Sequence, residues 1–149
     1  MTNLIITAAV GLDIKRVDFF LKTLRKYYSD EVLILIGNND QKLKHSLSKY
    51  NCKFFEIKTH RFDVQLQRYA IYLRLLKKEK FNKILCCDCR DIYFQSNPFN
   101  FDYKGEINFF LEDKKIKDCK YNSNWILKTY GEKNIKKFMI KLYFVLVQF

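Results

Sequence analysis

The sequence contains few of the residues that break or loosen regular structure. Its 149 residues include only four glycines and one proline, while hydrophobic residues make up 48% and aromatic residues 17%. This composition excludes a disordered, collagen-like or linker-dominated chain. A length of 149 residues suits one domain, or part of a larger one, and leaves little room for a second core.

Long hydrophobic runs are also missing. Lysines interrupt every apolar stretch, including Lys141 near the C-terminus, so no segment reaches the roughly 18 to 20 uncharged residues that span a bilayer. No basic residue precedes the short apolar segment at the N-terminus, and we therefore expect no secretory signal. These absences predict a cytoplasmic protein.

The cysteines do not form the pattern of a disulfide framework. Their number, five, is odd, and Cys86, Cys87 and Cys89 lie within four positions, too close for all of them to be bridged to one another. Alternation along a strand sends neighbouring side chains to opposite faces, and no pair has Cys-x-x-Cys spacing. We expect reduced thiols that pack in the core rather than ligate a metal.

Acidic residues are scarce, and the formal net charge is +12. A positive field of this size attracts polyanions such as nucleic acid or an anionic membrane. However, 22 of the 28 basic residues are lysines spread along the whole chain, which is equally typical of a lysine-rich solvated surface. Because arginine is scarce, we expect no specific nucleic-acid partner; a non-catalytic basic module that binds nucleic acid or anionic surfaces is the alternative hypothesis.

Strands and helices alternate in the hydrophobic pattern. Near-continuous apolar runs predict buried strands, and apolar residues spaced by three and four predict helices, the first capped by Asp13. In the third helix the expected inward stripe is Leu66, Tyr69, Leu73 and Leu76. The predicted strands are 3–10, 31–36, 53–57, 82–88 and 106–111, and the predicted helices are 14–28, 41–50 and 63–80. This order predicts an α/β fold of Rossmann type, with a mostly parallel sheet and helices on both faces.

Charged residues follow the fourth predicted strand at Asp88, Arg90 and Asp91. In a parallel sheet, ligands bind beyond the carboxyl ends of the strands. Carboxylate oxygens there can hold Mg²⁺ or Mn²⁺ while the metal bridges two phosphates, and a guanidinium can bind phosphate through two parallel hydrogen bonds. Ordinary caps or surface ion pairs are the alternative interpretation.

The segment after this strand resembles glycosyltransferases of the GT-A type that use nucleotide-diphospho-sugars. It fits the pattern Asp-x-Arg-Asp-x-x-Phe-Gln-x-x-Pro-Phe, with Asp88, Arg90, Asp91, Phe94, Gln95, Pro98 and Phe99 in place. Arg68, Tyr69 and Tyr72 resemble the family's Arg-Tyr-x-x-Tyr helix, and 7–11 resembles its nucleotide-facing first strand end. Asn122, Trp125, Ile126 and Gly131 resemble a later Asn-x-x-Trp-Ile segment, so the likeness extends from about Leu4 to Lys137.

The resemblance implies transfer of a sugar from a UDP- or GDP-sugar to a glycan or other acceptor. It implies that Mn²⁺ or Mg²⁺ is held by Asp91 as the more direct ligand, together with Asp88. The residues that it places around the donor are Thr7, Ala8, Gly11, Arg68, Asp88 and Arg90.

Three of these assignments have competing interpretations. Arg68 either reaches the donor at the sheet edge or lies in solvent on the polar face of its helix. Tyr69 and Tyr72 either pack in and beside the core or stack against a sugar. Gly11 either allows the donor to approach the backbone or simply serves a strand-to-helix turn.

The resemblance divides the chain into a nucleotide-sugar-binding part at 1–137 and an apolar tail at 138–149. The tail departs from the family's pattern, and we therefore expect truncation or a frameshift, with the acceptor-side and catalytic residues absent. An inactive glycosyltransferase fragment is therefore a further alternative hypothesis for the function. The lysines at 133, 136, 137 and 141 beside apolar residues would also suit weak peripheral membrane contact. A strand or helix packed on the core, or an exposed apolar remnant, is the alternative.

Overall fold

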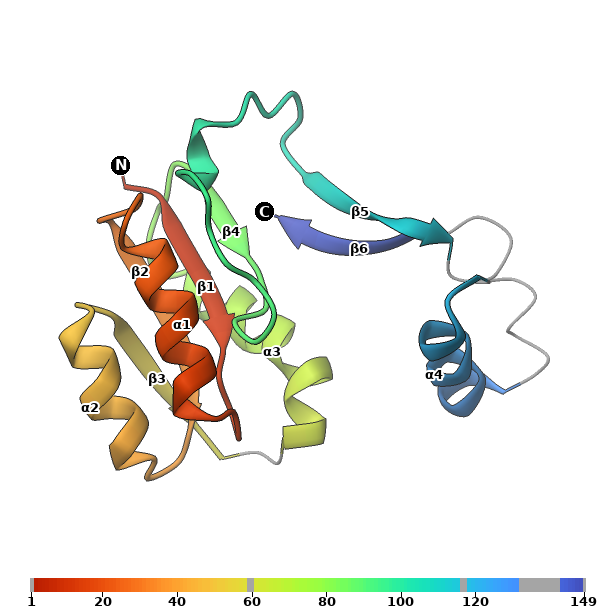
Figure 1. Ribbon diagram of the computed structural model, residues 1–149, viewed down its shortest axis with the longest axis horizontal. Coiled ribbons are helices and arrows are strands. Elements are labelled where there is room, and N and C mark those ends of the chain that lie inside the picture. Colours follow the sequence, from red (N-terminus) through yellow and green to blue (C-terminus); the bar gives the residue numbers. More distant parts are fainter. Residues whose placement is uncertain (1, 59–60, 116–117, 132–142, 149) are drawn as a thin grey trace.

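The computed structural model describes residues 2–58, 61–115, 118–131 and 143–148, and its main body is built on a sheet of four parallel strands (Figure 1). The strand order is β3-β2-β1-β4, with β1 and β2 in the middle. All three strand pairs are parallel. The strands are β1 (Leu4–Ala8), β2 (Glu31–Gly37), β3 (Lys53–Ile57) and β4 (Ile84–Cys86).

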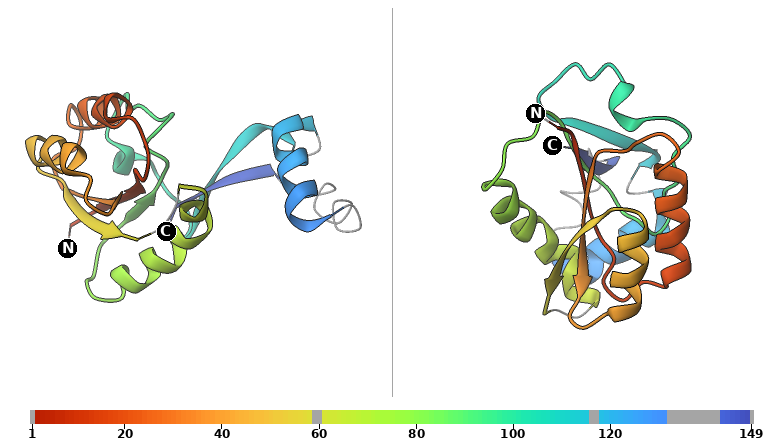
Figure 2. Two further views of the ribbon diagram at one scale, coloured as in Figure 1. Left: turned by 90° about the horizontal axis from the view of Figure 1, so that it is seen from below. Right: turned by 90° about the vertical axis from the view of Figure 1, so that its left-hand side faces the viewer.

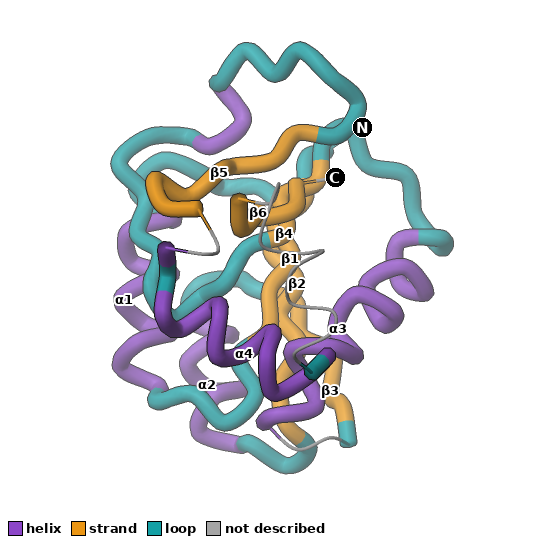
Figure 3. The backbone as a smooth tube through the Cα atoms, turned by 90° about the vertical axis from the view of Figure 1, so that its right-hand side faces the viewer, coloured by secondary structure: helices purple, strands orange, loops and turns teal. Residues whose placement is uncertain are grey.

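Helices cover both faces of this sheet. The helices α1 (Ile14–Leu24) and α2 (Gln41–Lys49) lie on one face and α3 (Arg61–Leu76) on the other (Figures 2 and 3). Each face has its own cluster of buried side chains, one including Ile5 with Phe20 of α1 and the other including Ile6 with Tyr72 of α3. The predicted α/β class, with a parallel sheet and a Rossmann-like arrangement, is confirmed.

The first helix follows the sequence pattern closely. The carboxylate of Asp13 accepts a hydrogen bond of 2.9 Å from the backbone N–H of Lys15, which confirms the predicted N-cap. The buried side chains of α1 are Val17, Phe20, Leu21 and Leu24. The helix ends at Leu24, four residues earlier than predicted, while Tyr28 still packs in the core beyond it.

The third helix is rotated relative to the predicted stripe. Tyr69 and Leu73 were expected to face inward, but they are 40% and 59% exposed. The residues that pack against the sheet include Val64, Tyr72, Leu75 and Leu76, so Leu76 of the predicted stripe does face inward. The side chain of Leu66 lies outside those that the structure describes. The hydrophobic pattern of this helix does not define one buried face, because apolar residues occur on two overlapping helical faces. As a result Arg68, four residues from both Val64 and Tyr72, lies on the inward side of α3.

The fifth predicted strand does not join the main sheet. The strand β5 (Asn108–Lys115) pairs antiparallel with β6 (Tyr143–Gln148), and these two strands form a separate ribbon. A parallel strand needs a long crossover connection, usually a helix. Between β4 and β5, however, the only regular element is the short 3-10 helix η1 (Pro98–Asn100), so the chain leaves the sheet. The helix α4 (Lys120–Tyr130) lies at the far end of the ribbon (Figure 1).

Part of the predicted tail is therefore a strand. Residues 143–148 form β6, which comes closest to the main sheet at β4. The lysines at 133, 136, 137 and 141, on which the membrane-contact hypothesis depended, lie outside the described residues. Among the described helices, none combines the length and hydrophobicity that crossing a bilayer requires.

Arg25 joins the loop between α1 and β2 to the turn between α2 and β3, on the amino side of the sheet. Its Nε donates to the carbonyl of Tyr50 at 2.9 Å, and Nη1 donates to the carbonyls of Tyr28 and Asp30 at 3.1 and 2.8 Å. Nη2 donates to the carbonyl of Asn51 at 3.0 Å. One planar guanidinium thus joins the end of α1, the approach to β2 and the turn between α2 and β3.

We expect Arg25→Lys to lower the free energy of unfolding by roughly 1–3 kcal/mol, because an ammonium cannot reproduce the fork of hydrogen bonds. Arg16→Lys is the matched control, since Arg16 is exposed on the same helix. Urea unfolding of both variants measures the difference. Equal stability of the two variants would show that the Arg25 hydrogen bonds contribute nothing.

Candidate functional site

A charged hollow of about 90 Å³ lies at the carboxyl edge of the sheet. It forms where the segments after β1 and β4 meet α3, because the ends of neighbouring parallel strands lie at the same edge. Four of the seven predicted site residues line it: Ala8, Arg68, Asp88 and Arg90. The other lining residues are Val10, Leu12, Val64 and Cys89.

The first ion pair of the hollow joins α3 to the end of β4. Nη1 of Arg68 donates a hydrogen bond to Asp88, and Nη2 donates to the hydroxyl of Tyr69 at 3.0 Å. Burial opposes the charge of Arg68, but the attraction of Asp88 outweighs it, so the pKa of the guanidinium is raised. The side chain of Arg68 is only 19% exposed, which rules out the solvent-facing interpretation.

Arg68 also retains an unused donor. Its Nε is buried and has no hydrogen-bond partner among the described residues. A buried donor without a partner costs free energy that an acceptor atom can recover. The contacts of Arg68 with Asp88 and Tyr69 are made by its two Nη atoms, while Nε is an unpaired donor inside the protein.

The second ion pair lies at the mouth of the hollow. Nε of Arg90 donates to Asp91 at 2.8 Å, and this hydrogen bond is the main cause of the raised pKa of Arg90. The two side chains are 48% and 62% exposed. Pairs this exposed contribute little to stability and exchange partners easily. Asp91 does not itself line the hollow, whereas its partner Arg90 does.

The remaining two predicted residues lie apart from the lining. Thr7 is completely buried in β1, so its side chain offers nothing to a ligand in the hollow. Gly11 is exposed and has a φ of 65° in the turn between β1 and α1. This left-handed conformation favours glycine, so the turn itself accounts for the residue.

The second half of the segment that resembles the glycosyltransferase motif, which includes Phe94 and Phe99, packs against the core. The ring of Phe94 contacts Phe20 with centroids 5.4 Å apart, and the ring of Phe99 contacts Tyr28 at 5.2 Å. The side chain of Asn97 accepts a hydrogen bond from the backbone N–H of Phe99 at 3.0 Å and so caps the start of η1. These contacts hold the loop after β4 against the α1 side of the sheet.

The carboxylates fit a divalent cation only in part. Asp88 and Asp91 supply the oxygen ligands that Mg²⁺ and Mn²⁺ prefer. Within the described ranges, no group of three or more His, Cys, Asp or Glu side chains could hold a metal ion. Two carboxylates suffice for the kind of site in which substrate phosphates and water complete the coordination.

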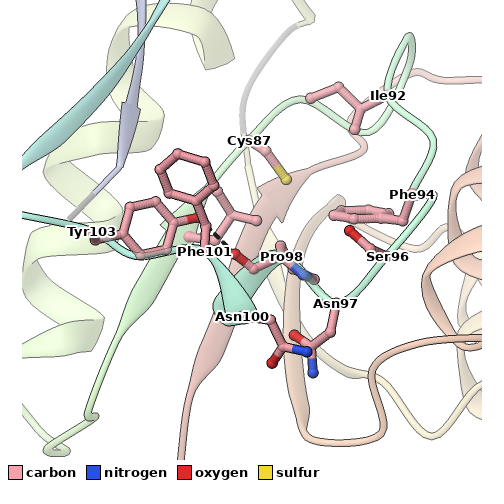
Figure 4. Close-up of a pocket in the computed structure, with 10 residues that line it drawn as sticks. Cys87, Ile92, Phe94, Ser96, Asn97, Pro98, Asn100, Phe101 and Tyr103 are labelled. Carbon is pink, nitrogen blue, oxygen red and sulfur yellow. Dashed lines mark hydrogen bonds between the residues drawn. The ribbon is translucent and has the colours of Figure 1, made fainter.

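A larger cavity, of about 450 Å³, lies between β4 and the loop that follows it (Figure 4). Phe101 and Tyr103 stand on one side and Phe94 on the other, with Cys87 between them. None of its lining residues is charged, and it shares none with the charged hollow. No motif in the sequence indicates this cavity, and its mainly apolar lining does not suit a phosphate group.

Three lining residues of the charged hollow were also missed. Val64 precedes Arg68 by four residues, so helical spacing alone places the two on one face of α3. Leu12 follows Gly11 directly, and Cys89 lies between Asp88 and Arg90. Their positions next to predicted site residues could have indicated that they line the same hollow. All three are apolar or weakly polar and carry no motif of their own.

The cysteines behave as the sequence predicts. All five lie in the described part of the chain, and none forms a disulfide. Cys86 packs on the α3 side of the sheet and Cys87 on the α1 side, as alternation requires. Burial raises the pKa of the Cys52 and Cys87 thiols, and it raises the pKa of Cys89 to about 11.

No protein-family model matches the chain, and no curated protein matches it. Among solved structures, 4-diphosphocytidyl-2C-methyl-D-erythritol synthase is similar, with a TM-score of 0.45 and 12% sequence identity. The matched region covers 59% of this chain and 46% of that chain, so it spans less than half of the other protein. The α/β class of the present chain rests on its own sheet topology rather than on this likeness.

We expect one fast-reacting thiol in the native chain and five after denaturation. Thiolate is the reactive form, and the raised pKa values of Cys52, Cys87 and Cys89 keep these thiols protonated at pH 8. Cys86 is buried as well, whereas Cys119 is partly exposed. Titration with a chromogenic disulfide at pH 8 counts the fast thiols, and Cys119→Ser should remove the fast phase. Any fast-reacting thiol that remains in that variant would contradict the core assignment.

Proposed function

We propose that this chain is the donor-binding part of a GT-A-type glycosyltransferase. In this proposal it binds a nucleotide-diphosphate sugar, and Mn²⁺ or Mg²⁺ assists departure of the diphosphate as the sugar passes to a glycan or other acceptor. The observation that carries the proposal is the meeting of Arg68, Asp88 and Arg90 in one hollow at the carboxyl edge of a parallel sheet.

The guanidinium groups suit a diphosphate. Arg68 and Arg90 approach the hollow from different elements, one from α3 and one from the segment after β4. Planar guanidinium forks bind phosphate oxygens bidentately, and charge-assisted hydrogen bonds are about twice as strong as neutral ones. Two cations placed at this edge would stabilise negative charge that develops on a leaving diphosphate.

The size of the hollow suggests which part of the donor it holds. Its volume of about 90 Å³ is well below the roughly 300–1,000 Å³ of pockets that enclose whole ligands. We therefore assign the hollow to the diphosphate. The nucleoside and the sugar would lie outside it, with the nucleoside near the backbone of 8–12 at the end of β1.

The metal would supply a Lewis acid that offsets charge on the diphosphate. Asp91 and Asp88 are the carboxylates that would hold it, with the phosphates as further ligands. The chain's own residues would orient the donor and exclude competing anions. A catalytic base and the acceptor site are not assigned to any residue of this chain.

We expect UDP- or GDP-sugars to raise the melting temperature only in the presence of Mn²⁺ or Mg²⁺. A ligand at about 100 times its Kd stabilises the native state by about 2.7 kcal/mol, a shift of roughly 5–10 °C for a chain of this size. Thermal unfolding with UDP-, GDP- and CMP-sugars, with and without Mn²⁺, measures the effect.

A cooperative melt with no shift for any donor would contradict the proposal. Metal-independent binding of a polyanion whose affinity falls steeply between about 50 and 200 mM salt would instead favour the basic-module alternative.

We expect Asp91→Ala to abolish the metal-dependent part of donor binding without unfolding the chain. The side chain is 62% exposed, so its removal costs little stability. Asp102→Ala is the matched control, because Asp102 is exposed and lies outside the hollow. Isothermal titration with the donor that gives the largest melting shift compares the variants. Unchanged metal-dependent binding in Asp91→Ala would remove this residue from the metal assignment.

A further inference from the structure

The cavity of about 450 Å³ beside β4 has no part in the proposed function (Figure 4). Its volume lies within the roughly 300–1,000 Å³ that is typical of pockets for small ligands. Such pockets are lined mainly by apolar and aromatic side chains, with a few polar groups that fix the orientation of the ligand. The lining here combines three aromatic residues, Phe94, Phe101 and Tyr103, with three uncharged polar ones, Ser96, Asn97 and Asn100.

Contacts outside the cavity hold its aromatic walls in place. The backbone N–H of Phe94 donates a hydrogen bond to Oγ1 of Thr23 at 3.2 Å. On the other side, the hydroxyl of Tyr103 donates to the carbonyl of Pro98 at 2.6 Å, and Nζ of Lys83 lies 5.4 Å from the centroid of the Tyr103 ring. Walls that are already fixed by such contacts lose little conformational freedom when a ligand binds, which favours affinity.

Phe101 is exposed although it lines the cavity. Its side chain is 64% exposed, and its ring lies 5.1 Å from that of Tyr103. A ligand between Phe101 and Phe94 would cover apolar surface that now faces water, and this burial is favourable. Aromatic rings attract one another in offset or edge-to-face arrangements. Aromatic side chains on two sides of the cavity therefore favour a flat aromatic ring as its occupant.

The lining does not suit a charged ligand. Burial of a charge without an opposite partner is strongly unfavourable, and no charged residue stands among the described residues that line the cavity. Cys87 supplies no charge either, because burial raises the pKa of its thiol well above the usual range. The hydroxyl of Ser96 and the amides of Asn97 and Asn100 can form hydrogen bonds with an uncharged polar atom of a ligand.

We propose that this cavity is a second ligand site, and that it binds an uncharged, flat aromatic ring that carries a polar atom. The ring would lie between Phe94 on one side and Phe101 with Tyr103 on the other. Its polar atom would form a hydrogen bond with Asn97 or Asn100. The site shares no lining residue with the charged hollow, so this inference does not depend on the assignment of the hollow to a diphosphate.

A packing gap beside the edge strand is the competing explanation. Within the described residues, β4 pairs only with β1, while β5 pairs with β6 outside the main sheet. Such a gap would bind apolar molecules without regard to the shape of their rings. A site with aromatic walls distinguishes a flat ring from a puckered one of the same size. The two explanations therefore differ in a measurable preference.

The test titrates small probe molecules into the complete chain and follows amide signals by nuclear magnetic resonance. Indole should bind saturably with a Kd of about 1 mM or tighter, and it should shift the side-chain amide signals of Asn97 and Asn100. Indole-3-carboxylate should bind at least about tenfold more weakly, because its charge finds no partner in the cavity. Cyclohexanol should bind at least about threefold more weakly than phenol, which has the same size and hydroxyl group but a flat ring.

Three variants locate the binding. Phe101→Ala removes one aromatic wall at an exposed position and should weaken indole binding about fivefold or more. Phe54→Ala is the matched control, because Phe54 is exposed on β3, the opposite edge strand, and should change the affinity by less than about twofold. Ser96→Trp places a large side chain at an exposed position of the lining and should abolish indole binding. Thermal unfolding checks that each variant is folded.

Saturable indole binding that is weakened in Phe101→Ala and lost in Ser96→Trp would support the site. Absence of saturation up to about 10 mM indole would overturn it. Equal affinities for phenol and cyclohexanol, or for indole and its carboxylate, would overturn it as well, and so would equal weakening in Phe54→Ala. None of these results bears on the proposed function, because the binding of nucleotide-sugars is measured separately.

Discussion

The central position of β1 is the constraint on which the rest of the molecule depends. Leu4, Ile5 and Ile6 are completely buried, and parallel neighbours flank the strand on both sides. A strand in this position has its carboxyl end beside that of β4. The backbone after Ala8 and the charged residues after Cys87 therefore meet, and the hollow exists because of that meeting.

The rotation of α3 decides the electrostatic character of the hollow. If Tyr69 and Leu73 faced the sheet, Arg68 would lie toward solvent and Asp88 would remain an isolated carboxylate. With Val64 and Tyr72 facing the sheet instead, Arg68 reaches Asp88 and neutralises it. The result is two ion pairs at this edge of the sheet, Arg68 with Asp88 and Arg90 with Asp91.

The loop after β4 contains a charged segment at the sheet edge and an aromatic segment that packs on the core. The first few, Asp88, Arg90 and Asp91, are exposed and charged, whereas Phe94 and Phe99 pack toward α1 and Tyr28. Apart from η1 the loop has no regular structure, so these aromatic contacts supply the rigidity that a helix or strand would otherwise give. Charged groups on a loop anchored in this way keep a defined position at the sheet edge.

The α/β class, the first four predicted strands, the cap at Asp13 and the segment that carries the charged residues could all be predicted from the sequence. These features follow from local periodicity and from short-range hydrogen bonding, which a single sequence displays directly. It also pointed to Ala8, Arg68, Asp88 and Arg90, which the hollow brings together.

Three features could not be predicted, because they depend on long-range packing: the buried face of α3, the pairing of each carboxylate with its arginine, and the pairing of β5 with β6 outside the main sheet. Two overlapping apolar faces on one helix are equivalent until a sheet packs against one of them. Likewise, the partner of a charged side chain depends on elements distant in sequence, as Arg68 and Asp88 show across 20 positions. Long-range packing determines both the buried helix face and the ion-pair partners, and local sequence patterns carry no information about it.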